Sequence, residues 1–191
     1  MVAGTARVRL DHAGLTTLLE RLDTAMTEPG TLCLIGGGAT ILLGQHVRQT
    51  DDIHVWKQAS TMHWPSFSAA CAASGLTFDL QEDEPGVPHL QIIQPGVVYV
   101  PGWDAGRRTW FTEAERVVWQ GAWLTVTVPP PHVIAASKLV RGDARDLEDC
   151  LWLMAAHDLD ARAIQGAIKA MPRSARDTAE GNLDLLSFLK P

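Results

Sequence analysis

Apolar and polar residues follow two different periods along this chain, and the change of period falls near residue 128. Before it, short apolar runs have the length of buried or half-buried strands. These runs are residues 32–35, 53–56, 78–81, 89–94, 97–100, 116–119 and 122–128, with an edge strand at 7–10. Pro95-Gly96 and Gln120-Gly121 separate consecutive runs and predict two hairpins.

Helical periodicity dominates the remainder. A stripe of leucines preceded by Asp11 predicts a capped helix over residues 12–27, and a small-residue segment ending at Gly75 predicts another over 60–75. Pro129-Pro130-Pro131 closes the strand region, because proline cannot continue a sheet ladder. Helices are then predicted over residues 132–140, 144–157, 160–170 and 174–189. The pattern predicts an α+β fold, with a mixed sheet flanked by helices in residues 1–128 and a helical C-terminal half in 129–191.

The stretch 32–56, LCLIGGGATILLGQHVRQTDDIHVW, combines these elements most tightly. It predicts a buried strand, a glycine turn at residues 36–38, a short helix over 39–43 ended by Gly44, and a second strand that begins near Asp52. Backbone N–H groups at such a turn can cradle phosphate, and a carboxylate on the neighbouring strand can hold Mg²⁺ against it.

These residues resemble the nucleotidyltransferase superfamily, in the branch of abortive-infection-type (AbiEii-like) toxins. That branch has Gly-Gly-x-Ala followed by Arg-x-Thr-x-Asp-Ile-Asp. The matching residues are Gly36, Gly37, Ala39, Arg48, Thr50, Asp52 and Ile53, while a register starting at Gly37-Gly38 matches less well. The last aspartate of the pattern is His54 here.

A second stretch, PPPHVIAASKLVRGDARDLEDC, carries basic and acidic residues at helical spacing. If one helix ran through it, Lys138, Arg141, Arg145 and Asp149 would share a face, and a solvated face with ion pairs such as Arg145 with Asp149 would explain them. The stretch also resembles the Lys-Leu-x-Arg and Arg-Asp-x-x-Asp motifs of the same branch. Lys138, Leu139, Arg141, Arg145, Asp146 and Asp149 match these motifs.

The resemblance implies that the chain binds a nucleoside triphosphate through Gly36, Gly37, Arg48, Thr50, Lys138 and Arg141. It implies that Asp52 and Lys138 are catalytic residues, and that Asp52 and His54 are ligands of Mg²⁺ or Mn²⁺. It implies that Arg145, Asp146 and Asp149 support the cleft from the helical half. The acceptor would be RNA or protein, and a cognate toxin or antitoxin would be a partner. Arg48 has two roles open to it: it can bind phosphate, or pair with Asp146 or Asp149.

His54 leaves the activity open, because imidazole suits Mn²⁺ or Zn²⁺ better than Mg²⁺. Asp79 and Asp104 are candidates for a further oxygen ligand, and Asp52, His54 and His89 form an alternative transition-metal set. Two classes of function follow. One is a metal-dependent nucleotidyltransferase, and the other is a catalytically degenerate protein of the same fold that binds a nucleotide or a partner as a regulatory module.

Composition narrows the setting of either function. A net charge of −6 argues against a dedicated nucleic-acid binder. No apolar run approaches the roughly 20 residues that a membrane span needs, and the N-terminus lacks a signal-peptide core. Three cysteines without metal spacing predict buried, reduced thiols. We therefore expect a cytoplasmic protein without membrane contact.

Overall fold

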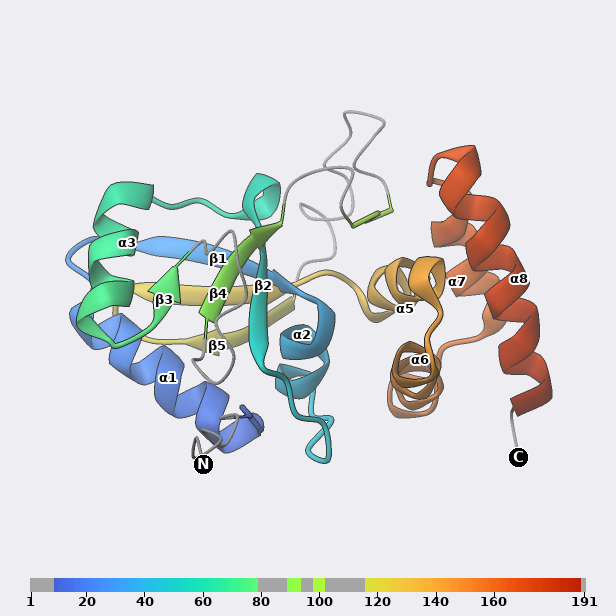
Figure 1. The fold of residues 1–191 in the computed structure, drawn as a ribbon, viewed down its shortest axis with the longest axis horizontal. Helices are drawn as coiled ribbons and strands as arrows, with labels where there is room; N and C mark the ends of the chain where they lie inside the picture. The colour runs from blue at the N-terminus through green and yellow to red at the C-terminus, as the bar shows by residue number, and fades with distance from the viewer. Residues whose placement is uncertain (1–8, 79–88, 94–97, 102–115, 190–191) are drawn as a thin grey trace, which may run out of the picture. The chain divides into compact units, whose positions relative to one another are not determined.

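The structure is a computed structural model that describes residues 9–78, 89–93, 98–101 and 116–189 (Figure 1). The chain forms two compact units. One comprises Met1–Ile93 with Val117–Val128, and the other comprises Gln94–Arg116 with Pro129–Pro191. One boundary thus falls at the first residue of the proline run. The described helices include none long and apolar enough to cross a membrane.

The first unit is built on a mixed six-stranded sheet. Its strands are β1 (Gly30–Ile35), β2 (Asp52–Trp56), β3 (Thr77–Phe78), β4 (His89–Ile93), β5 (Arg116–Gln120) and β6 (Leu124–Val128), in the order β3-β4-β2-β1-β6-β5. Strand β1 is antiparallel to β2 and parallel to β6, and β2 is parallel to β4. The predicted mixed sheet is confirmed, and so is the prediction that its first two strands are neighbours.

Strand β1 lies near the middle of the sheet, which explains its continuous apolar run. Leu32, Cys33 and Leu34 are fully buried although alternate side chains point to opposite faces. Helices α1 (His12–Ala25) and α3 (Trp64–Ala73) pack against each other, and α2 (Gly36–Leu42) packs on β2 (Figure 1). Asp11 caps α1 as predicted, accepting from the Gly14 N–H at 2.8 Å.

In the second unit, the described residues after Pro129 are mainly helical, as predicted. The unit contains α5 (Pro131–Arg141), α6 (Ala144–Ala156), α7 (Ala161–Ile168) and α8 (Arg173–Leu189), and α5 contacts the other three. Gly142 ends α5 in the left-handed region at φ +63°, so the basic residues of the second motif lie on two helices rather than one. Asp143 and Asp160 cap α6 and α7.

The helix predicted over residues 60–75 is wrong at its start, because α3 begins at Trp64. Ser60 instead hydrogen-bonds to two strands of the sheet. Its hydroxyl accepts from the Cys33 N–H at 3.0 Å and donates to the Trp56 carbonyl at 2.8 Å. Thr61 pairs with the backbone of Thr31. Hydrogen bonds to neighbouring strands thus hold this segment out of the helix.

Four predicted strands fall partly outside the described residues: 7–10, 78–81, 89–94 and 97–100. Strand β3 is limited to Thr77–Phe78 within them, and the predicted turn at Pro95-Gly96 lies outside them. The described strands beside β4 are β2 and β3, and both run parallel to it. Near the N-terminus, Leu10 forms an isolated bridge with Thr50 in place of a longer strand, while residues 7–8 lie outside the description.

All three cysteines are buried and unbridged, as expected of structural thiols. Burial raises the pKa of the Cys71 and Cys150 thiols to about 12, which leaves both protonated and unreactive at neutral pH.

Strand β6 is shorter than predicted, beginning at Leu124 rather than at residue 122, because Asp23 of α1 binds the hairpin turn. Its carboxylate accepts backbone N–H groups of Ala122, Trp123 and Leu124 at 2.9, 2.7 and 2.7 Å. A Cβ at Gly121 would overlap the same carboxyl group, so a larger residue there would displace the Asp23 side chain. Burial would raise the pKa of Asp23, but the three backbone bonds outweigh it and lower the pKa.

We predict that Asp23→Ala lowers the free energy of unfolding by about 1–3 kcal/mol at neutral pH, because it removes a charged acceptor from three donors. The folded-state pKa of Asp23 is depressed, so this contribution is complete above its unfolded value of about 3.9 and fades as the pH falls through the folded value. Urea unfolding at pH 7 and pH 3 measures it. Glu20→Ala on the same helix is the control, and an Asp23→Ala chain as stable as that control would contradict the prediction.

Candidate functional site

The β1–α2 junction is tighter than the sequence suggested. All three glycines lie inside α2, which begins at Gly36, so the predicted glycine turn before a helix over 39–43 is wrong. Gly36 alone makes the turn, at φ +67°, a conformation that side chains rarely adopt. Gly44, at φ +108°, follows the helix as predicted.

Gly36 and Gly37 allow close approach of the segment that precedes and begins β2. A Cβ at Gly36 would lie 3.1 Å from Nδ1 of His54, and one at Gly37 would lie 3.1 Å from Oγ1 of Thr50 and 3.2 Å from Nη2 of Arg48. A Cβ at Gly38 would meet only ordinary contacts at 4.0 Å. The two glycines that face the cluster are therefore those of the register that matches better.

The carboxylate of Asp52 is bonded on both oxygens. The Thr50 hydroxyl donates to Oδ1 at 2.9 Å, and Nε2 of His54 lies 2.9 Å from Oδ2. Residues 50, 52 and 54 share one face of an extended segment, as their spacing predicts. The side chains of Asp52 and His54 remain 36% and 24% exposed, so the pair is open to a ligand from solvent.

The hydrogen bond from His54 is the largest influence on the pKa of Asp52 and holds it well below its usual range. Burial opposes this effect, whereas positive charge on His54, the Thr50 hydroxyl and positive charge on His89 add to it. Asp52 is therefore an anion at neutral pH. Because an ionised carboxylate cannot donate, Nε2 of His54 carries the hydrogen of the 2.9 Å contact.

The surroundings of Asp52 are rich in imidazole and poor in carboxylate. In the parallel β2–β4 register, His89 lies opposite Asp52 and Gln91 opposite His54. Asp51 pairs with Arg9 at 3.5 Å. The described residues contain no group of three His, Cys, Asp or Glu side chains placed to hold a metal. Asp79 and Asp104 lie outside the described residues.

Arg48 lies between the glycine helix and β2. Its Nη1 donates to the Gln49 carbonyl at 2.6 Å, while its Nη2 faces Gly37. Both roles considered for Arg48, phosphate binding and pairing with Asp146 or Asp149, stay predictions.

In the helical unit, Lys138 forms a buried ion-pair network. Its ammonium lies 3.2 Å from Asp146 and 2.7 Å from Asp149, and the three side chains are 6%, 1% and 1% exposed. Arg141 adds bonds to Asp146 at 2.7 and 2.9 Å and an ion pair with Asp143 at 3.0 Å. Arg145 is exposed on the next helix.

Four of the motif residues therefore have a structural role within their own unit: Lys138, Arg141, Asp146 and Asp149. Asp146 and Asp149 are too buried to form a solvated face, and Lys138 supplies the charge that compensates them. The convergence of Lys138 and Arg141 with Asp52 stays a prediction. The acidic partner that sequence reasoning missed is Asp143, whose capping role concealed its second bond to Arg141.

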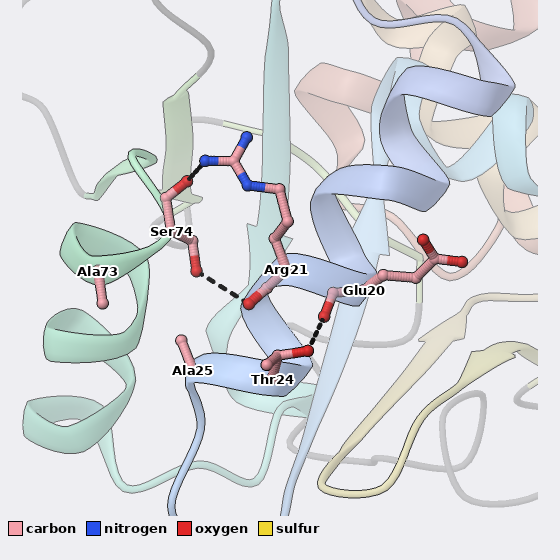
Figure 2. Close-up of a pocket in the computed structure, with 6 residues that line it drawn as sticks. All are labelled: Glu20, Arg21, Thr24, Ala25, Ala73 and Ser74. Atoms are coloured by element: carbon pink, nitrogen blue, oxygen red, sulfur yellow. Dashed lines mark hydrogen bonds between the residues drawn. The ribbon is translucent and has the colours of Figure 1, made fainter.

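A shallow hollow lies between α1 and α3, and Figure 2 shows its lining. Arg21 donates to the Ser74 carbonyl at the end of α3, and the Ser74 hydroxyl donates back to the Arg21 carbonyl at 3.2 Å. Thr24 bonds to the Glu20 carbonyl at 2.9 Å. These polar groups connect and terminate two helices, which is a structural role.

Comparisons with known proteins add no relative: no protein-family model matches this sequence, and no curated protein or solved structure matches it.

We predict that Lys138→Met lowers the free energy of unfolding by about 3–5 kcal/mol, since it leaves two buried carboxylates without their ammonium. Arg145→Met, on an exposed position of α6, should change it by less than about 0.5 kcal/mol. Chemical unfolding followed by circular dichroism compares the two. Equal stability of the two variants would show that the buried network contributes nothing.

Proposed function

We propose that this chain binds a nucleoside triphosphate at the junction of β1, α2 and β2, in the manner of a nucleotidyltransferase-type protein. The observation that carries the proposal is the convergence of Gly36, Gly37, Arg48, Thr50, Asp52 and His54 at this one junction. Their chemistry combines close backbone approach, a guanidinium and a partly exposed carboxylate–imidazole pair. Guanidinium groups recognise phosphate oxygens through two parallel hydrogen bonds.

The described residues do not fit the pair of Mg²⁺ ions that efficient nucleotidyl transfer uses. Such a pair needs about three carboxylates. Here Asp52 already accepts two hydrogen bonds, and its cross-strand neighbour is His89 rather than an acid. We therefore propose that the main function of the site is to bind a nucleoside triphosphate. This is the regulatory-module alternative of the sequence analysis.

Weak nucleotidyl transfer to RNA or protein is the second candidate. It is favoured by one observation, the partly exposed Asp52 carboxylate that stays ionised beside an imidazole. One oxygen and one imidazole nitrogen form a donor set that Mn²⁺ accepts more readily than Mg²⁺ does. A cognate toxin or antitoxin and a cytoplasmic setting belong to this proposal as expectations from the resemblance.

The binding proposal predicts different behaviour for two adjacent glycines. Gly37→Ala should weaken nucleoside triphosphate binding at least about tenfold, because its Cβ would press on Thr50 and Arg48. Gly38→Ala should bind within about twofold of the native chain, because its Cβ meets only ordinary contacts and alanine favours the helix. Calorimetric titration with the four common triphosphates measures both. The proposal fails if the native chain binds none of them.

The transfer candidate has its own assay. Labelled nucleotide should pass to bulk RNA or protein more readily with Mn²⁺ than with Mg²⁺, and Asp52→Ala should abolish transfer. His54→Asp should raise the Mg²⁺-dependent rate, because oxygen ligands suit that ion. If neither the native chain nor His54→Asp transfers label with either ion, the second candidate is excluded and binding alone remains.

A further inference from the structure

Two side chains hydrogen-bond to the carboxylate of Asp52. Its two oxygens accept from the Thr50 hydroxyl and from Nε2 of His54, both at 2.9 Å. The Thr50 hydroxyl also lies 3.0 Å from the Asp52 carbonyl. In either charge state of the imidazole, Nε2 carries the hydrogen of this contact, so its lone pair cannot bind a metal while the contact lasts.

Gly36 leaves room for the ring in this position. The absent side chain leaves room for Nδ1 of His54, which lies 3.1 Å from where a Cβ would stand. Among the described residues, Nδ1 has no hydrogen-bond partner, so Asp52 alone orients the ring through Nε2. The imidazole therefore occupies the position beside Oδ2 of Asp52 where a coordinated cation would otherwise lie.

We propose that His54 takes the place of a protein-bound metal ion, so that the site binds the polyphosphate of a nucleotide without a divalent cation held by Asp52. This inference rests on the proposed nucleotide binding. The ligand would be a nucleotide polyphosphate whose negative charge is compensated by protein groups. The inference also explains why the cross-strand neighbour of Asp52 is an imidazole, and why the described residues contain no group of three side chains placed to hold a metal.

The inference predicts a specific consequence for His54→Asp. Positions 52 and 54 lie on the same face of β2, so the variant places two carboxylates side by side. They repel each other unless a cation lies between them. His54→Asn removes the imidazole without adding a carboxylate, and it is the matched control.

Thermal unfolding with EDTA, Mg²⁺ or Mn²⁺ provides a test that needs no nucleotide. The native chain and His54→Asn should keep their Tm within about 1 °C in all three buffers, whereas metal should raise the Tm of His54→Asp by about 5 °C or more. A native chain whose Tm rises by a similar amount with either metal would overturn the inference. The change in Tm of the native chain on adding metal tests the inference even if His54→Asp does not fold.

Nucleotide titration separates this inference from the function on which it rests. The native chain should bind a nucleoside triphosphate with a Kd in EDTA within about threefold of that in Mn²⁺. Binding that requires Mn²⁺ or Mg²⁺ would overturn the metal-free site while leaving nucleotide binding in place. Absence of binding in every buffer would overturn the proposed function, and with it the polyphosphate ligand of this inference.

Discussion

The candidate site depends on one carboxylate, that of Asp52, which lies 2.9 Å from the Thr50 hydroxyl on one side and 2.9 Å from the His54 imidazole on the other. The pairing exists because three alternate residues share a face at the start of β2. Strand β2 is fixed in register by β1 on one side and β4 on the other. A glycine helix start then approaches closely enough that Gly36 covers the imidazole and Gly37 contacts Thr50 and Arg48. Strand periodicity thus places Thr50, Asp52 and His54 on one face, and the two glycines leave room for them.

The helical unit resolves its buried charges differently. Lys138 compensates Asp146 and Asp149 where all three are almost fully buried, so the ion pairs there carry a desolvation cost that only good geometry offsets. Asp52 and His54 are a quarter to a third exposed and remain accessible. The two motifs therefore differ in what they can do. One is open to a ligand, and the other connects α5 to α6.

The sequence predicted the elements that depend on local pattern. The buried run at residues 32–35, the capping aspartates Asp11, Asp143 and Asp160, and the helices after the proline run all appear within a few residues of their predicted positions. The same-face placement of Asp52 and His54 was also predictable, because the period of a strand is two.

Elements that depend on distant partners could not be predicted. Ser60 and Thr61 have helical surroundings in sequence but bond to strands, and Asp23 shortens strand β6 about a hundred residues away. The three glycines were expected to form a turn, yet all three lie within α2, next to the segment that begins β2. The burial of Lys138 arises because Gly142 divides the motif between two helices. In each case a contact distant in sequence overrides local preference.

The most direct test of the central claim is a crystal structure of the native chain with a non-hydrolysable nucleoside triphosphate and Mn²⁺, with anomalous scattering used to locate manganese. The account predicts that His54 Nε2 still donates to Asp52 and that any manganese lies on the phosphates, beyond coordination distance of both side chains. A manganese peak bound by Asp52 and His54 together, at about 2.0–2.3 Å from each, would contradict it.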